Sequence, residues 1–215
     1  EAEYRLRNRN GHYLWVHDRG RVCDYAPDGS PARVVGMVQD ITDRKQLELQ
    51  LQELASNDTL TGLANRRQGM IFLMSQVELC QRLGLSLGLG FIDIDNFKAI
   101  NDVFGHLAGD RVLQQVGQAV KGAVRGSDLV CRWGGEEFIV IAPNTTAEQM
   151  SLVAEKVRLA VLHDLADQMP AVTVSAGVAS AAGRAIDLNA LMASADSALY
   201  RAKENGRNRV ELAPG

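Results

Sequence analysis

The sequence predicts an α+β fold in which a mixed sheet is flanked by helices and preceded by antiparallel strands and a linker helix. From residue 58 onward, apolar runs typical of strands alternate with segments of helical periodicity. In the middle of this part, Gly134-Gly135 lies between the β-prone runs Leu129-Val130 and Ile139–Ile141, a pattern typical of a tight hairpin. A hairpin requires an antiparallel pair, which favours an α+β sheet with helices on its faces over a doubly wound sheet.

Residues 1–42 are predicted to form three antiparallel strands. Asn10-Gly11 indicates a hairpin between the first two, and Pro27–Ser30 indicates a second turn. Three strands without a covering layer make a poor independent domain, and the first residue is Glu rather than Met. We therefore expect half of a domain, in a chain that is a fragment of a longer protein. The strands are expected around Tyr4 and Leu6, over 12–25 and over 34–41.

Residues 43–57 are predicted to form a linker helix, with Thr42 as its N-cap. Leu47, Leu51 and Leu54 recur at i, i+4 and i+7. This seam covers about two heptads, which is enough to pair two parallel chains. An amphipathic helix that packs on its own domain explains the same pattern, and the sequence leaves both interpretations open.

Residues 58–215 are predicted to form a larger domain. After a turn that begins at Asp58, Asn65 is expected to cap a helix that runs to about Leu83. A long helix over about 107–124 carries Val112, Leu113, Val116 and Val120 on one face. The other elements are expected as a buried strand at 85–95, a helix at 146–168, a strand at 171–179, a helix at 187–204 and a short strand at 208–212.

Composition excludes several classes of function. The chain of 215 residues has a net charge of −3, which gives no electrostatic reason to expect nucleic acid or an acidic membrane surface as a partner. The longest nearly apolar run, Leu83–Ile92, is too short to span a bilayer. Cys23, Cys80 and Cys131 are isolated and odd in number, which fits neither a disulfide framework nor a zinc site. We expect a cytoplasmic location, although a part of the parent protein outside this segment could anchor it to a membrane.

Acidic residues at two predicted turns are candidates for a metal site. Asp93 and Asp95 close the buried strand and, with a period of two, point to the same face roughly 7 Å apart. If this strand neighbours the Gly-Gly hairpin, Asp93, Glu136 and Glu137 converge into an all-oxygen cluster suited to Mg²⁺. A solvated acidic turn is the simpler alternative for the two glutamates, and Asp95 is expected to cap the next helix.

Basic and polar residues elsewhere are ambiguous when taken singly. Lys203 and Arg207 are expected at i and i+4 near the end of the last helix, where like charges repel by about 0.2–0.5 kcal/mol. A bound phosphate would offset that repulsion. Four further residues would be ordinary loop or helix-end residues on their own: Lys98, Asn101, His106 and Asp110.

The N-terminal strands resemble the C-terminal half of a PAS sensory domain. The resemblance is carried by Tyr4-Arg5-Leu6, Asn10-Gly11, Leu14-Trp15-Val16 and the stretch from Gly36 to Lys45, whose Asp40-Ile41-Thr42-Asp43-Arg44 run is its most specific part. It implies that the parent protein senses a signal, but it does not identify the ligand.

The chain from Asp58 to Val210 closely resembles the GGDEF family of diguanylate cyclases. Gly134–Phe138 matches the family's signature in its Glu variant, Gly-Gly-Glu-Glu-Phe. Such a pentapeptide alone would be weak evidence, but here it is one of four matching blocks that follow each other in the family's order. The blocks are Asp58–Arg67, Asp93–Asp110, the hairpin itself and Ala195–Asn208.

The resemblance implies a palm-like sheet and the conversion of two GTP into cyclic di-GMP with release of pyrophosphate. Each protomer of a homodimer would hold one GTP. By position, Asp93, the carbonyl of Ile94 and Glu136 would bind Mg²⁺ (or Mn²⁺), with Glu137 close by, and Glu136 is also the candidate catalytic base. Asn101 and Asp110 match guanine-reading positions, with His106 between them and Phe97 in the same block. Lys98, Lys203 and Arg207 match phosphate-contacting positions.

Arg125-Gly126-Ser127-Asp128 stands five residues before Gly134, where active members of the family often carry an RxxD product-inhibition site. Arg can stack on a guanine and grip its acceptors, so Arg125 and Asp128 are expected to bind cyclic di-GMP. The alternative is that Arg125 ends a helix, where the dipole favours a cation, and Asp128 opens a loop.

The partners expected are therefore GTP, cyclic di-GMP and a second copy of the chain, paired through the linker helix and the cyclase domain. Two other functions fit the same pattern less well. One is an inactive module that signals by binding cyclic di-GMP, which the intact carboxylates disfavour. The other is a cyclase that uses ATP, which the signature disfavours.

Overall fold

The computed structural model describes residues 1–165, 171–183 and 185–214, with residues 49–55 described by their backbone alone. The chain divides into two compact units, Glu1–Leu54 and Ala55–Gly215. Each unit is described below by itself.

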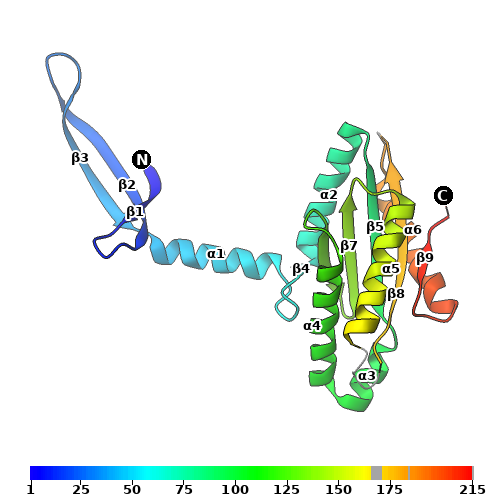
Figure 1. Ribbon diagram of the computed structural model, residues 1–215. Helices are drawn as coiled ribbons and strands as arrows, with labels where there is room; N and C mark the ends of the chain where they lie inside the picture. Colours follow the sequence, from blue (N-terminus) through cyan, green and yellow to red (C-terminus); the bar gives the residue numbers. More distant parts are fainter. Residues whose placement is uncertain (166–170, 184, 215) are drawn as a thin grey trace. The chain divides into compact units, whose positions relative to one another are not determined.

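The first unit contains a three-stranded antiparallel sheet in the order β1-β2-β3. The strands are β1 (Ala2–Arg7), β2 (Tyr13–Tyr25) and β3 (Pro31–Asp40), as predicted (Figure 1). Among its described side chains, Val16 and Ile41 are the buried apolar ones. A sheet with so little buried surface lacks the covering layer that stabilises an independent domain.

Helix α1 (Thr42–Ser56) follows the sheet, but Thr42 does not cap it. The Thr42 hydroxyl instead accepts a hydrogen bond from the Trp15 backbone N–H of β2 at 2.9 Å, so its oxygen binds the sheet rather than the start of the helix. Of the predicted seam, the Leu47 side chain is exposed, whereas the side chains of Leu51 and Leu54 lie outside the described residues.

The second unit is built on a six-stranded mixed sheet in the order β4-β6-β7-β5-β8-β9. The central pairs β6·β7, β7·β5 and β5·β8 are antiparallel, and the outer pairs β4·β6 and β8·β9 are parallel. The prediction of an α+β fold with a mixed sheet is confirmed. The strands are β4 (Ala64–Asn65), β5 (Ser86–Ile94), β6 (Leu129–Gly134), β7 (Glu137–Pro143), β8 (Val174–Ala182) and β9 (Val210–Leu212).

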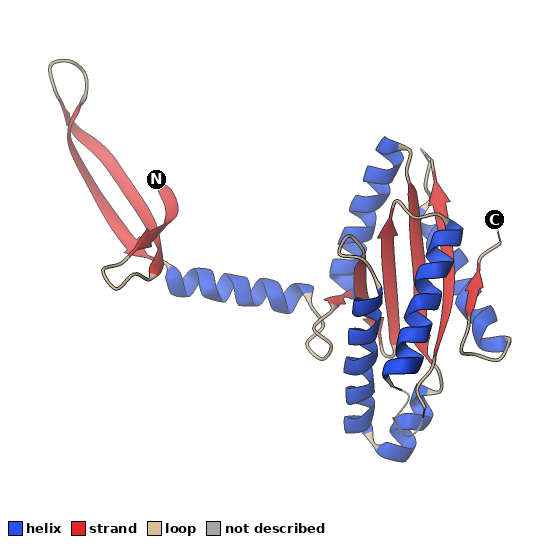
Figure 2. Ribbon diagram, viewed as in Figure 1, coloured by secondary structure: helices blue, strands red, loops and turns tan. Residues whose placement is uncertain are grey.

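Helices cover both faces of this sheet (Figures 1 and 2). Alternate residues of β7 show the arrangement: Phe138 and Val140 pack with α4 and α5, whereas Ile139 and Ile141 pack with α2 and α6. Because successive side chains of a strand point to opposite faces, both faces of the central strands become core. The helices are α2 (Arg66–Leu83), α3 (Phe97–Phe104), α4 (His106–Ala123), α5 (Ala147–Asp164) and α6 (Leu188–Glu204).

The structure corrects several predicted bounds. No bounds were predicted for helix α3, although Asp95 was expected to cap a helix there. The helix is short, and Asn96 before it has φ 56° and makes no side-chain capping bond. The strand expected at 171–179 lies at Val174–Ala182. Helix α5 ends at Asp164, and residues 166–170 lie outside the described part of the chain. The predicted Asn65 cap is confirmed, since its side chain accepts from the Gln68 N–H.

Candidate active site at the β6–β7 turn

The turn between β6 and β7 is made by Gly135 and Glu136, one residue later than the glycine pair suggested. Gly135 has φ 49°, whereas Gly134 belongs to the strand and carries no positive φ. The register between β6 and β7 shifts between Arg132 and Gly134. Glu136 therefore lies at the tip of the hairpin, and Glu137 begins β7.

Arg132 holds this turn in place. Its Nε and Nη2 donate to the Gly135 carbonyl at 3.0 and 2.8 Å, and its Nη1 lies 3.2 Å from both carboxylate oxygens of Asp58. Partial burial raises the pKa of Asp58, but hydrogen bonds from Thr61 and Arg132 outweigh burial and hold that pKa below its ordinary value. Sequence reasoning missed the role of Arg132, although an arginine three residues before an acidic turn was a usable signal.

Asp93 is placed directly opposite Glu137 in the antiparallel β5–β7 ladder. It is 5% exposed, and its Oδ2 lies 2.8 Å from the Nζ of Lys203 on α6. Burial raises the pKa of Asp93 above its ordinary value; Lys203 opposes this shift, and the charges of Glu136 and Glu137 add to it. The predicted proximity of this strand end to the hairpin is therefore present.

The three carboxylates do not converge as closely as predicted. Across the described part of the chain, no three acidic, histidine or cysteine side chains form a set that would hold a metal ion. Asp93 has Lys203 as its cationic partner instead. The chemistry of the donors still fits a divalent cation, because all are hard oxygens. The charged form of Asp93 is disfavoured chiefly by burial and further by two acidic neighbours, so added positive charge stabilises it.

The sequence suggested that Asp95 caps the next helix, but the structure shows that it does not. Its carboxylate accepts hydrogen bonds from the hydroxyls of Thr173 and Ser175 and from the backbone N–H of Asn208. Asn96 takes the N-cap position instead. The two aspartates of the Asp-Ile-Asp stretch thus have different partners.

The α3–α4 corner brings the predicted guanine-reading residues together. A Cβ on Gly109 would overlap the Asn101 side-chain amide and contact the Phe97 ring, so the absence of that atom lets α3 lie against α4 beside Asp110. Asp110 is half-buried, whereas Lys98 and His106 are exposed. Asn101 and Asp110 therefore lie on neighbouring helix segments at one corner.

Lys203 and Arg207 are not helical neighbours, contrary to the prediction. Helix α6 ends at Glu204, and the backbone N–H of Arg207 donates to the Ala202 carbonyl from a left-handed turn in which Gly206 has φ 109°. Such a closure satisfies the last carbonyls of a helix. Lys203, within the helix, pairs with Asp93, and Arg207 is exposed beyond the helix.

A family model described as diguanylate cyclase, GGDEF domain, matches residues 55–209 of the chain. The chain belongs to the GGDEF family. The GGDEF domain thus coincides with the second unit of the structure, which spans Ala55–Gly215. A PAS fold model matches residues 1–38, in the N-terminal strands.

Curated and solved relatives agree with this family. Diguanylate cyclase DgcM of Escherichia coli (strain K12) is 42% identical over 176 residues, which cover 81% of this chain and 42% of DgcM. The chain thus spans less than half the length of that relative. The coiled coil and GGDEF domain of DgcB from Caulobacter crescentus, in complex with c-di-GMP, matches with a TM-score of 0.73 at 32% identity, over 79% of this chain and 91% of that one. The active GGEEF domain of a diguanylate cyclase from Vibrio cholerae matches with a TM-score of 0.67 at 35% identity, over 71% of this chain and 99% of that one.

In this GGDEF domain, Arg125 and Asp128 form a closed turn just after α4. Asp128 Oδ2 accepts from the Arg125 backbone N–H at 3.1 Å and lies 3.4 Å from its Nε, while Arg125 Nη2 donates to the buried Thr145 hydroxyl at 2.8 Å. The Arg125 side chain is 59% exposed, whereas that of Asp128 is fully buried. Because α4 ends at Ala123, Arg125 lies beyond the helix rather than at its end.

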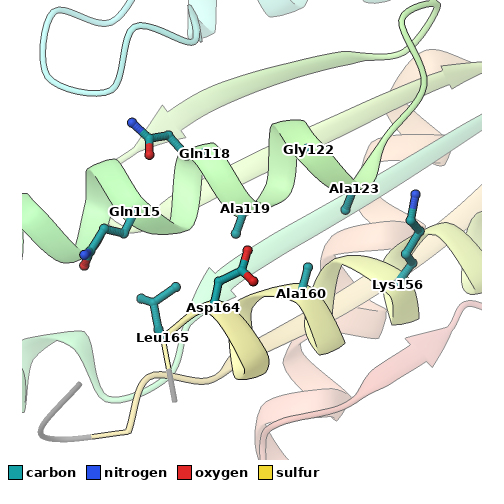
Figure 3. Close-up of a pocket in the computed structure, with 9 residues that line it drawn as sticks. All are labelled: Gln115, Gln118, Ala119, Gly122, Ala123, Lys156, Ala160, Asp164 and Leu165. Atoms are coloured by element: carbon teal, nitrogen blue, oxygen red, sulfur yellow. The ribbon is translucent and has the colours of Figure 1, made fainter. Parts of the chain in front are cut away.

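A cavity of about 470 Å³ between α4 and α5 lies apart from the predicted site, and none of the predicted site residues lines it. Figure 3 shows Gln115 and Gln118 on one wall and Lys156 and Asp164 on the other. Its floor consists mostly of small side chains, which is expected where two helices pack closely.

None of the helices formed by the described residues has the length and hydrophobicity needed to span a membrane.

Proposed function

We propose that this chain is the catalytic part of a diguanylate cyclase, which condenses two GTP molecules into cyclic di-GMP and releases pyrophosphate. The observation that carries the proposal is the acidic corner of the sheet, where Asp93 faces Glu137 across the β5–β7 ladder and meets Lys203. Membership of the GGDEF family supports it. The activity is that named for DgcM and for the Vibrio cholerae domain.

Guanine is recognised by Asn101 and Asp110. Guanine offers an amine donor and O6 and N7 acceptors, which an amide and a carboxylate complement. The Asn101 amide lies against Gly109, the residue before Asp110 in the chain, and His106 and Phe97 belong to the same α3–α4 corner. Adenine lacks the amine and would leave Asp110 without a donor, which costs binding energy when the group is desolvated.

The triphosphate is held by Lys98, Lys203 and Arg207. All three are cations that would neutralise phosphate oxygens. Lys203 already carries a buried counter-charge in Asp93. We assign Lys203 to the phosphates nearest the acidic corner, because its ammonium group lies there.

A divalent cation, Mg²⁺ or Mn²⁺, would be bound by Asp93, the Ile94 carbonyl and Glu136, with Glu137 close by. When bound, such an ion supplies charge neutralisation of the triphosphate and lowers the pKa of a neighbouring hydroxyl. Glu136 accepts the proton of the attacking 3′-hydroxyl. The oxygen of that hydroxyl then forms a bond to the α-phosphorus, and the bond to the departing pyrophosphate breaks.

A second copy of the chain supplies the other GTP, because one domain carries one guanine-reading corner between α3 and α4 and one acidic corner at Asp93. The two 3′-hydroxyls attack the two α-phosphates across the dimer. The linker helix with its leucine seam is the first candidate for holding the chains together. The PAS segment would give the parent protein a sensory input.

The experiment that tests the proposal is incubation of the chain with GTP and Mg²⁺, followed by identification of the product. Glu136→Ala is expected to lower the rate by about 10²- to 10⁴-fold, the usual contribution of a general base. Removal of the metal with a chelator is expected to abolish product formation. Glu78→Ala, which removes an exposed carboxylate on α2, serves as the control and should keep the wild-type rate. Unchanged turnover in Glu136→Ala would refute the role assigned to that residue, and a product other than cyclic di-GMP would refute the proposed activity.

Product inhibition is proposed at Arg125 and Asp128. The guanidinium of Arg125 is held at one edge by Asp128 and Thr145, but its side chain is 59% exposed, which leaves surface on which a guanine of cyclic di-GMP can stack; Asp128 keeps the turn closed from its buried position. Arg125→Met removes the charge and leaves the backbone donor to Asp128 in place. We expect cyclic di-GMP to bind this variant at least about tenfold more weakly, since one charge-assisted contact is worth roughly 1.5–3 kcal/mol.

Calorimetry with cyclic di-GMP measures this effect directly, and progress curves measure its consequence. Arg125→Met should continue to form product after the wild type slows. Lys121→Met, a substitution of an exposed cation on the last turn of α4, is the control and should bind and slow as the wild type does. Equal product affinity in both variants would argue against the inhibitory site.

A further inference from the structure

Asp95 is a buried carboxylate that the proposed chemistry does not use. It is 6% exposed, and it accepts three hydrogen bonds: from Thr173 Oγ1 at 2.7 Å, from Ser175 Oγ at 2.6 Å and from the Asn208 backbone N–H at 3.0 Å. Its own N–H donates to the Thr173 carbonyl at 2.9 Å. A carboxylate that accepts several hydrogen bonds holds its donors in place, and here the donors are Thr173 just before β8, Ser175 in β8 and the turn after α6.

The turn after α6 adopts a backbone that needs such support. Arg207 and Asn208 are consecutive non-glycine residues with φ 62° and 46°. Residues in this region carry a conformational cost and persist where their surroundings hold them. Asp95 holds the Asn208 backbone, while Arg158 Nη1 of α5 donates to Asn208 Oδ1 at 2.8 Å. The turn is therefore fixed from two elements.

Arg207 directly precedes Asn208, the residue that Asp95 and Arg158 hold. Asp93, two residues before Asp95, is paired with Lys203 of α6. The two aspartates thus attach the end of α6 and the turn that follows it to the same end of β5. One contact fixes Lys203, and the other fixes the backbone next to Arg207.

We propose that Asp95 is a positioning residue for Arg207: through the Asn208 backbone it holds the turn that presents the Arg207 guanidinium to the triphosphate. This inference rests on the proposed function, in which Arg207 contacts phosphate. Asp95 itself touches no substrate. Its removal releases the turn and lets Arg207 leave the position from which it binds.

A double-mutant cycle between Asp95→Ala and Arg207→Met tests the proposal. The affinity for a non-hydrolysable GTP analogue, with Mg²⁺, is measured by calorimetry on the full chain. Each single variant is expected to bind about tenfold more weakly, the size of one lost charge-assisted contact. The double variant should bind no more weakly than Arg207→Met alone, because Asp95 acts through Arg207. Losses that multiply would show that Asp95 acts independently and would overturn the proposal.

A second measurement needs no nucleotide, so it separates a failed anchor from a failed proposed function. Hydrogen exchange at the Asn208 amide should be slow in the wild type and fast in Asp95→Ala. Arg158→Met loosens the same turn without disturbing the buried carboxylate, and it replaces Asp95→Ala in the cycle if that variant does not fold. Asp187→Ala is the control: it removes a carboxylate that caps α6 through the N–H groups of Asn189 and Ala190, and it should lower thermal stability without changing exchange at Asn208. Unchanged exchange in Asp95→Ala would overturn the proposal.

Discussion

Asp93 and Asp95 show how two identical side chains on one strand end acquire different uses. Asp93 faces acidic residues across the β5–β7 ladder and has one cation beside it, so its charge is partly uncompensated. Asp95 has three hydrogen-bond donors around it. A carboxylate with a surplus of negative charge nearby attracts a cation, whereas one surrounded by donors organises the backbone.

Gly109 is important because it has no side chain. Gly109→Ala places a methyl group where the Asn101 amide now lies, and the end of that flexible side chain must move away. We expect GTP to bind about tenfold more weakly, because one guanine contact is lost, and discrimination against ATP to fall. The measurement is calorimetry with non-hydrolysable analogues of both nucleotides.

Gly122→Ala provides a matched control for Gly109→Ala on the same helix. A Cβ at Gly122 would meet nothing within 4 Å, so this change adds only the gain of alanine over glycine in a helix, about 0.5–1 kcal/mol. Gly122→Ala should be somewhat more stable and bind GTP as the wild type does. If Gly109→Ala also binds GTP normally, the guanine role of Asn101 is wrong.

The strands and long helices of the GGDEF domain were largely predictable from the sequence, because their patterns are local. Strand β7 reads as a continuous apolar run, and helices cover both of its faces. Helix α4 shows the predicted buried face at Val112, Leu113, Val116 and Val120. Such elements follow from hydrophobic periodicity alone.

The short elements and long-range contacts were not predictable in the same way. Helix α3 starts after Asn96, which has a left-handed backbone and makes no capping bond, so the cap expected at Asp95 did not locate its start. Asp95 meets Ser175 and Asn208, which are 80 and 113 residues away in the chain, and no local pattern indicates such partners. Gly206 did offer a signal, because a glycine in this position commonly ends a helix, and it places Arg207 beyond α6.

Packing between elements also depends on contacts that periodicity does not reveal. At Gly177 of β8, a Cβ would overlap the backbone of α6 at Ala195, Ala198 and Leu199. The helix therefore lies directly on the strand, and this close approach fixes the axis of the element that carries Lys203. The sequence shows a glycine in a strand, which indicates a close backbone contact, but it does not say with which partner.

At the level of the assembly, the proposed reaction makes activity depend on protein concentration. Two GTP molecules on two chains must meet, so the rate per protomer should rise with concentration and level off once the dimer is saturated. Leu51→Asp puts a charge into the predicted leucine seam of the linker helix. Because burying a charge costs more than about 1.4 kcal/mol, the rise in rate is expected at protein concentrations at least about tenfold higher. Specific activity and sedimentation mass, measured over the same dilution series, report the two quantities together.

The matched variant is Gln52→Asp, which adds the same charge to the linker helix outside the seam. Gln52→Asp should dimerise and catalyse the reaction as the wild type does, because a charge that the seam does not bury costs little. Equal dimer mass and activity in Leu51→Asp and Gln52→Asp would place the dimer contact elsewhere in the chain. A rate per protomer that stays constant on dilution to a purely monomeric sample would contradict the two-chain reaction itself. The 3′-hydroxyl and the α-phosphate would then have to belong to nucleotides bound by a single chain.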